Sequence, residues 1–300
     1  ADLLIIAKTS IKVGDLLTAQ TVSSFLQPET MLYAESLFLL GQYYAGKNMP
    51  DIASGYFRKL LAECPGSPLA DGARVESAAI MISGRQYDQA FALLNEAKDP
   101  ALADRKTALM IVALFSSHRG AQAADLLARG LNRILAIPSG EAVLREASLY
   151  YYAAGDIRML GQYTAYLANF PGNEPFINYY MGKLSFEKDQ LDNAYYYLYK
   201  LSMAESEYSA ESFYYVGLIS LHLHNNRNNA IVCFQKAADG APAGSQFGLK
   251  AKLNLGILLA ESQNPEAASQ VLREIIAKEN ISAQIQAENL KAYLDAARTQ

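Results

Sequence analysis

The sequence has little that would suit it to a membrane or to a nucleic acid. Its 300 residues contain no apolar run that approaches the roughly 18 residues needed to span a bilayer, and the stretch from Leu3 to Ala7 is far shorter. Lysine and arginine are scattered rather than clustered, and the formal net charge is −4. Because nucleic acids select basic patches, we expect neither a transmembrane segment nor a nucleic-acid partner.

The sequence also lacks the motifs of common active sites and of metal or cofactor sites. It has no glycine-rich phosphate loop, no zinc-protease motif, no Cys-x-x-Cys pair and no nucleophile elbow. Of its 3 histidines, His222 and His224 stand two residues apart, so they point to different faces of a helix and cannot share a metal ion. We therefore expect no enzymatic activity, no cofactor and no bound metal.

What the sequence does contain is a stretch, residues 34–67, that is typical of two helices with a short break between them. Apolar and small residues recur with the helical period in the first helix, at Leu37, Leu40, Gly41 and Tyr44. The same period continues in the second helix, at Ala53, Phe57, Leu60 and Leu61. Asn48 is placed to cap the second helix, Pro50 falls in its first turn, and Cys64-Pro65-Gly66 ends it.

This stretch recurs along the chain, which indicates an array of repeats. Counting Ala34 as the first position, the repeat starts again near Asp71, Arg105, Glu141, Pro175, Ala210 and Leu249. The alanine of the second helix returns as Ala90, Ala124, Ala194 and Ala268, and one residue late as Ala230. The late alanine indicates an insertion in the turn before it, and Leu160 stands in the alanine's place in the repeat that starts at Glu141.

Residues 34–67 have the signature spacing of the tetratricopeptide repeat (TPR), and the chain resembles that family. The resemblance implies an all-α fold, a right-handed superhelical solenoid of antiparallel helix pairs. We expect about eight pairs, which comprise a degenerate first pair in residues 1–33 and seven repeats in residues 34–281. Residues 282–300 are expected to form a C-terminal capping helix.

The two cysteines are expected to be buried and unpaired. In the repeat register Cys64 and Cys233 lie five repeats apart. Helices that pack about 8–10 Å from one another place these residues tens of ångströms apart, whereas a disulfide needs Cα atoms within about 7 Å.

Tyrosine is distributed unevenly. Of 20 tyrosines, fourteen lie between Tyr150 and Tyr215. Their rings can fill the gaps between helices, or they can form a recognition surface, because tyrosine offers a large contact area and a hydroxyl. Both interpretations stay open here, except that Tyr44 and Tyr151 fall where the TPR family buries an aromatic residue, and we assign those two to the core.

The resemblance also indicates which residues face a ligand, because TPR proteins line a concave groove with fixed positions of each first helix. Carried onto this chain, those positions predict a binding wall: Arg145, Tyr152, Phe176, Tyr179, Lys183, Phe186, Tyr214, Leu218 and His222. We expect Tyr152, Tyr179 and Tyr214 to lie along this wall and to be exposed. Groove positions nearer the N-terminus carry mostly small residues, among them Ser83, Ser116 and Ser117.

The function that this pattern favours is a non-enzymatic scaffold that binds a peptide or protein segment in an aromatic groove. The basic clamp with which co-chaperone members of the family hold a C-terminal carboxylate is absent from these positions. The alternative is a component of a bacterial envelope transport or assembly machine whose concave face binds a small ligand or polysaccharide. It is favoured by the loop from Pro65 to Ala70, which looks like that of envelope members of the family.

The expected location follows from the same likeness. We expect a periplasmic or outer-membrane-associated protein, with the cytoplasm as the alternative. The chain begins at Ala1 without methionine, which fits a processed protein or a trimmed one, and the sequence does not separate these.

Overall fold

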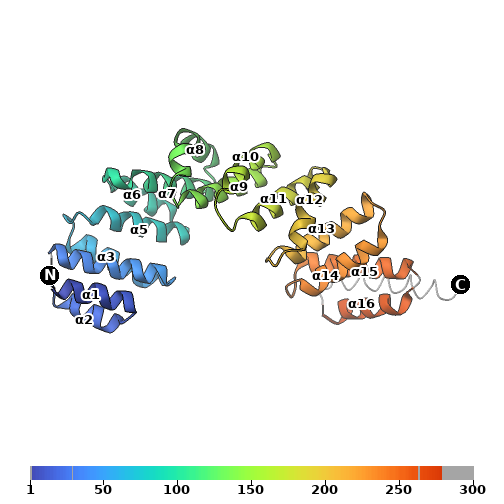
Figure 1. Cartoon of the computed structure of the whole chain (residues 1–300), viewed down its shortest axis with the longest axis horizontal. Coiled ribbons are helices and arrows are strands. Elements are labelled where there is room, and N and C mark those ends of the chain that lie inside the picture. The colour runs from blue at the N-terminus through green and yellow to red at the C-terminus, as the bar shows by residue number, and fades with distance from the viewer. Residues whose placement is uncertain (1, 29, 263, 279–300) are drawn as a thin grey trace. The chain divides into compact units, whose positions relative to one another are not determined.

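The computed structural model describes residues 2–28, 30–262 and 264–278, which form α-helices and one short 3-10 helix (Figure 1). The first helices are α1 (Asp2–Val13), α2 (Leu16–Ser24), α3 (Met31–Gly46), α4 (Pro50–Glu63), α5 (Ala70–Ser83), α6 (Tyr87–Glu96), η1 (Pro100–Leu102), α7 (Ala103–Ser116) and α8 (Gly120–Leu135). The others are α9 (Gly140–Ala153), α10 (Ile157–Leu167), α11 (Glu174–Glu187), α12 (Leu191–Ser202), α13 (Ser209–His222), α14 (Arg227–Gly240), α15 (Gln246–Glu261) and α16 (Pro265–Lys278). The predicted all-α fold is confirmed for the described residues, and the expected capping helix at 282–300 lies outside them.

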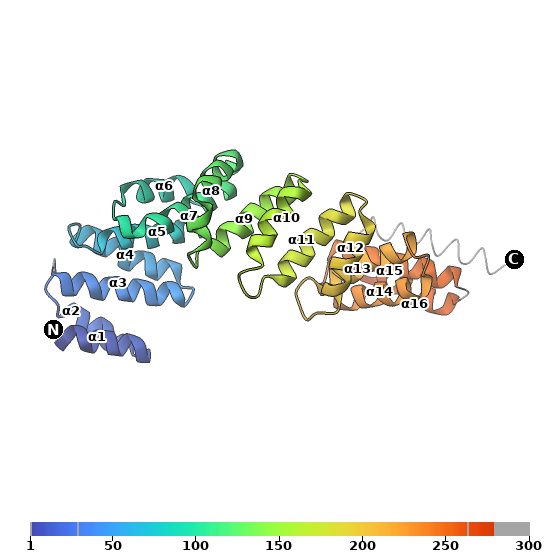
Figure 2. The same ribbon diagram turned by 45° about the horizontal axis from the view of Figure 1, so that its top comes forward.

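The chain divides into two compact units, residues 1–150 and 151–300. In the N-terminal unit, helices joined by short turns form pairs, α1 with α2, α3 with α4, α5 with α6 and α7 with α8 (Figure 1). In the C-terminal unit, α11 pairs with α12, and Figure 2 shows α13 to α16 side by side. Neighbouring pairs also pack on one another within each unit, as α1 does on α3 and α13 on α15, so each unit is a stack of antiparallel helix pairs.

In three of the described pairs, a glycine of the first helix contacts a large side chain of the second helix. A Cβ atom added at Gly41 would lie 2.5 Å from Cε1 of Phe57, a side chain that is fully buried. The same contact recurs in two pairs of the C-terminal unit, as Gly182 with Leu198 and as Gly217 with Phe234. Glycine at these positions therefore lets the two helices approach closely around a densely packed core.

Each described turn within a pair contains one residue in the left-handed backbone region. These residues are Gly14, Asn48, Arg85, His118, Gly155, Asp189 and Asn225, and their φ angles lie between 46° and 80°. The fifth residue after each of them is fully buried: Ala19, Ala53, Ala90, Ala123, Leu160, Ala194 and Ala230. The left-handed residue therefore marks where the second helix docks against the first.

This relation corrects one expectation in α8. The buried alanine there is Ala123, whereas Ala124, the alanine that the repeat spacing selected, is only half-buried. His118 adopts the left-handed conformation one residue earlier than the spacing requires, so the third repeat begins one residue before Arg105. Leu160 does occupy the alanine's place in its own repeat, where it is fully buried.

The expectation that Asn48 caps α4 is wrong. Asn48 has φ 57° and forms the turn, and the N-cap residue is Met49, which makes no side-chain cap hydrogen bond. Asparagine tolerates the left-handed region better than most residues, so here it marks the turn rather than the helix start. Pro50 does open α4, and the helix ends at Glu63, directly before Cys64-Pro65-Gly66.

Both cysteines are buried and free, as the repeat register predicts. Each exposes 4% of its surface. Burial raises the pKa of the Cys233 thiol, so this residue stays protonated and packs as a small hydrophobic side chain.

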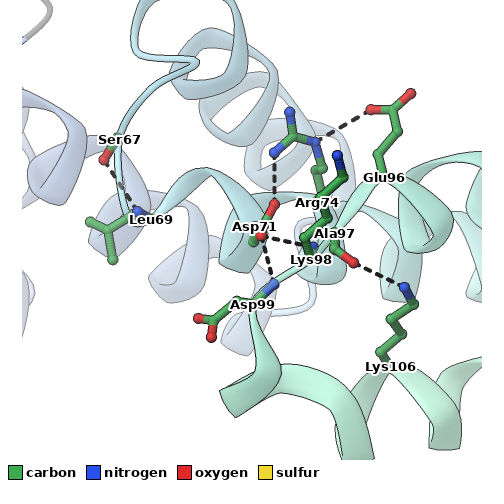
Figure 3. Close-up of polar contacts among 9 residues, drawn as sticks. All are labelled: Ser67, Leu69, Asp71, Arg74, Glu96, Ala97, Lys98, Asp99 and Lys106. Atoms are coloured by element: carbon green, nitrogen blue, oxygen red, sulfur yellow. Dashed lines mark hydrogen bonds and ion pairs between the residues drawn. The ribbon is translucent and has the colours of Figure 1, made fainter.

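A polar junction holds the loop that follows α6 against the start of α5 (Figure 3). One carboxylate oxygen of Asp71 accepts hydrogen bonds from the backbone N–H groups of Lys98 and Asp99, both at 2.8 Å, and the other accepts one from Arg74 at 2.9 Å. Lys106 of α7 donates to a carbonyl of the same loop at 2.9 Å. Burial opposes the charge of Asp71, but these donors outweigh it and lower the pKa of the carboxyl group.

Candidate functional site

The predicted binding wall falls mainly on α11 and α13, and Tyr179 is its central residue. Tyr179 is not exposed as expected, because only 7% of its surface reaches solvent. Its ring stacks on that of Tyr208 with 4.4 Å between centroids, and its hydroxyl donates to Glu211 at 2.8 Å. Tyr208 directly precedes α13, so a residue of the connection covers the face that was expected to be open. Tyr179 is thus a core residue that joins α11 to α13.

Lys183, one helical turn after Tyr179, completes a closed polar triad with Glu211. Its ammonium donates to the Tyr179 hydroxyl at 2.9 Å and to Glu211 at 3.1 Å. Burial opposes the charge on Lys183, but Tyr215 and Glu211 outweigh this effect and raise the pKa of the ammonium. Burial, followed by the bond to Glu211, also raises the pKa of Tyr179, so its hydroxyl stays protonated. All three polar groups are engaged with one another, so the triad ties neighbouring helix pairs together.

The more exposed part of the wall lies where the end of α9 meets α11. Tyr152 donates its hydroxyl to Glu187 at 3.0 Å, and its ring meets Tyr180 edge to face at 5.0 Å. Tyr180 packs in turn on Phe176, with 4.6 Å between centroids, and Phe176 is buried. Tyr152 and Tyr180 are half-buried and Glu187 is exposed, so this edge of the aromatic cluster reaches solvent.

Tyr214 and Leu218 pack against the core cluster between α13 and α14. Tyr214 is half-buried, and its ring faces Phe234 of α14 at 6.0 Å between centroids.

The other predicted residues have the following surroundings. Phe186 contacts the ring of Tyr215 at 5.1 Å. His222 is exposed in the last turn of α13. Arg145 lies in the N-terminal unit, where its guanidinium pairs with Glu141 at 3.4 Å.

Four side chains that build the cluster were not among the predicted residues: Tyr180, Tyr208, Glu211 and Tyr215. Tyr180 directly follows Tyr179, which was predicted in its place. Glu211 occupies the same position of its repeat as Phe176 does, so the groove positions of the TPR family indicate it as well. Tyr215 follows Tyr214, which those positions selected in its place. Tyr208 lies in a connection between repeats, where neither helical periodicity nor a groove position gives a signal.

Several solved structures are similar to the chain. An IFIT1 monomeric mutant with Gppp-AAAA has 16% sequence identity and a TM-score of 0.38, and the match covers 93% of this chain and 60% of that one. A human IFIT1 dimer with PPP-AAAA has 15% identity and a TM-score of 0.36, over 93% of this chain and 68% of that one. The P58(IPK) TPR domain has 10% identity and a TM-score of 0.31, over 98% and 89%. No protein-family model matches the chain, and no curated protein matches it either.

The fold assignment rests on the chain's own repeated geometry. Three of its helix pairs carry the small-to-large contact, and each described turn within a pair carries the left-handed residue at a regular spacing. This is a TPR-like helical-repeat protein. The similarity to the solved structures is too low to indicate an activity or a partner for this chain.

In the N-terminal unit of this TPR-like protein, small groove residues border a cavity of about 890 Å³, here called the turn cavity. It lies where α5 and α7 end and α6 begins, and α9 contributes one residue. Its polar lining includes Ser83, Gln86, Gln89, Ser116, Ser117 and Glu146. The sequence predicted small side chains here but gave no sign of a cavity.

The described residues contain no group of three or more His, Cys, Asp or Glu side chains placed to hold a metal ion. His224, one of the residues weighed as a ligand, instead packs its ring edge to face against Tyr195 at 5.0 Å. Across the described part of the chain, every helix is too short or too polar to cross a membrane.

Proposed function

We propose that this protein is a non-enzymatic scaffold that binds a segment of a partner protein on the surface formed by Tyr152, Tyr180, Lys183 and Glu187, here called the tyrosine surface. The hydrogen bond from Tyr152 to Glu187 carries the proposal. It fixes a half-buried aromatic ring and an exposed carboxylate side by side, which combines apolar contact area with a hydrogen-bonding edge.

The buried residues below this surface give it a rigid floor. Phe176 and Tyr179 are buried, and Tyr179 is held by Tyr208 on one side and by the triad with Lys183 on the other. Side chains that are already ordered lose little conformational freedom on binding, so more of the contact energy appears as affinity. In this proposal Phe176 and Tyr179 support the site, and the partner touches Tyr152 and Tyr180.

Capture of partner proteins by matched variants tests the proposal. Tyr152→Ala removes the central ring, and Tyr196→Ala removes a ring of α12 that is 64% exposed and lies outside the surface. We expect a true partner to bind the wild type and Tyr196→Ala equally well. Its affinity for Tyr152→Ala is expected to be about thirtyfold lower, because an interface anchor contributes about 2 kcal/mol or more. Quantitative mass spectrometry of the captured proteins, followed by titration of each candidate, measures this loss.

The control measurement is the melting temperature of each variant. Tyr152→Ala has to retain the wild-type melting temperature within a few degrees for a lost partner to count as a lost contact. Partners that bind Tyr152→Ala and the wild type equally well would refute the tyrosine surface. Partners that are lost only with Tyr196→Ala would move the site to the outer face of α12.

A second candidate function is a component of a bacterial envelope machine that binds a small ligand or a polysaccharide. The loop whose sequence suggested it runs from Pro65 to Ala70, and its first four residues line a cavity of about 970 Å³ together with Met31 and Glu63. The proposed location is the periplasm or the outer membrane, with the cytoplasm as the alternative. Cell fractionation tests the location, and a glycan array tests the ligand, for which no bound glycan is the contrary result.

A further inference from the structure

The turn cavity contains a carboxylate with a single hydrogen-bond partner among the described residues. Glu146 of α9 is half-buried and accepts a bond from the Ser116 hydroxyl at 3.2 Å. Within the described part of the chain no lysine, arginine or histidine pairs with it. Burial raises the pKa of Glu146, and the bond from Ser116 offsets only part of that effect. A desolvated carboxylate without a counter-charge is costly, so its presence needs an explanation.

The basic residues that line the cavity are Arg85, His118 and Arg119, and all three are exposed. Arg119 pairs with Asp88 at 3.2 Å and lies over the ring of Phe91 at 5.4 Å. Arg85 is exposed in its left-handed turn, at the rim of the cavity, where water and salt screen its charge. Glu146 is therefore a half-buried carboxylate in the cavity lining that no basic side chain of the described residues neutralises.

The remaining lining is suited to peptide groups. Ser83 and Ser117 offer hydroxyls, and Gln86 and Gln89 offer amides, which both donate and accept hydrogen bonds. The cavity volume of about 890 Å³ gives room for more than a single side chain.

We propose that the turn cavity binds a basic segment of a protein, with a lysine or arginine side chain paired to Glu146 and the flanking peptide groups bonded to the serine and glutamine side chains. The cationic end supplies the counter-charge that Glu146 lacks within the chain. This site lies wholly in the N-terminal unit and is independent of the tyrosine surface.

Two short peptides test the proposal on the full chain. One is N-acetyl-Gly-Ser-Lys-Ser-Gly-amide, and the other carries acetyl-lysine at the centre, which keeps the shape and removes the charge. We expect the lysine peptide to bind at least about tenfold more tightly, because a charge-assisted bond to a part-buried carboxylate is lost with the acetyl group. Chemical-shift titration of ¹⁵N-labelled protein measures both dissociation constants and reports whether resonances of the cavity residues move.

Matched variants separate Glu146 from the general negative charge of the chain. Glu146→Gln is expected to abolish the preference for the lysine peptide, and Glu141→Gln, on the same helix outside the cavity, is expected to keep it. Loss of a desolvated charge is expected to leave the melting temperature of Glu146→Gln equal or higher. If that variant fails to fold, the comparison of the two peptides on the wild type still decides.

Three results would overturn the inference. They are no detectable binding of the lysine peptide, equal binding of the two peptides, and a preference that survives in Glu146→Gln. A fourth contrary result is tighter binding of a peptide with glutamate at the centre, which would assign the cavity to an acidic partner held by Arg85.

Discussion

Substitution of Asp71 by asparagine is expected to loosen the loop between α6 and α7 without unfolding the N-terminal unit. In the wild type, one carboxylate oxygen of Asp71 accepts hydrogen bonds from two backbone N–H groups, and the other accepts one from Arg74. The single amide oxygen of asparagine can accept hydrogen bonds either from the two backbone N–H groups or from Arg74. Its NH2 group then faces the remaining donors and cannot accept a hydrogen bond from them. Hydrogen bonds to a charged group contribute about 1.5–3 kcal/mol each, and this side chain is 21% exposed, so we expect a loss of about 2 kcal/mol.

Cleavage at Lys98 reports this loss directly, because Lys98 is one of the two residues whose N–H groups the carboxylate holds. Cleavage of a native protein follows the population of the locally open state. A loss of about 2 kcal/mol therefore predicts about thirtyfold faster cleavage after Lys98 by a lysine-specific protease. Mass spectrometry of the fragments over time gives the rate at each lysine.

Asp51→Asn is the matched control, because Asp51 also lies in the first turn of its helix and is exposed. Its loss removes only the favourable interaction of an acid with a helix N-terminus, about 0.3–1 kcal/mol. Unchanged cleavage after Lys98 in Asp71→Asn, or equal acceleration in Asp51→Asn, would falsify the anchoring role of Asp71.

The pH dependence of this anchor has a defined sign. The folded-state pKa of Asp71 lies below its usual value of 3.8, so the carboxylate stabilises the fold above pH 3.8. This contribution is lost as the pH falls through the lower, folded-state pKa. The difference between wild type and Asp71→Asn is therefore expected to be constant near neutral pH and to shrink below about pH 3.8. A difference that persists unchanged at the acid end contradicts the assigned role of the charge.

Three further changes test the packing. Gly41→Ala is expected to destabilise by about 2 kcal/mol because its Cβ meets Phe57, whereas Gly55→Ala, in open space, stabilises by about 0.5–1 kcal/mol; equal urea midpoints would refute the close approach. Arg85→Gly is expected to stabilise by about 0.5–1 kcal/mol, since relief of the left-handed strain exceeds the entropy cost of glycine, and a lower unfolding free energy would contradict it. Tyr179→Ala is expected to destabilise by about 3 kcal/mol, as much as Tyr44→Ala, and a wild-type melting temperature would return Tyr179 to the surface.

The helix pairs and most of their buried residues could be predicted from the sequence, because local periodicity determines them. Leu37, Leu40 and Phe57 recur with the helical period and are all buried. The predicted position of the buried alanine in α8 was wrong by one residue, since His118 sets the register there and its conformation leaves no trace in the apolar pattern.

The candidate site was harder to predict, because it depends on contacts between repeats. Tyr179 occupies a groove position, yet Tyr208 covers it from a connection whose path no periodicity describes. The partner of Lys183 is Glu211, in the next repeat, and this pairing depends on how one pair stacks on another. The turn cavity likewise arises where several short segments leave space between them, which no single segment encodes.

The longer turn before α14 shows how this architecture can change its length. Its extra residue lies between the end of α13 at His222 and the left-handed Asn225, and Ala230 still follows Asn225 at the usual spacing. The spacing from the left-handed residue to the buried residue of the second helix is therefore fixed. The segment between the end of the first helix and the left-handed residue can be longer. An epitope tag or a fluorophore-binding sequence inserted directly ahead of Asp189 would use the same tolerance, which makes the corners of the helix pairs the natural places to graft new sequence onto this protein.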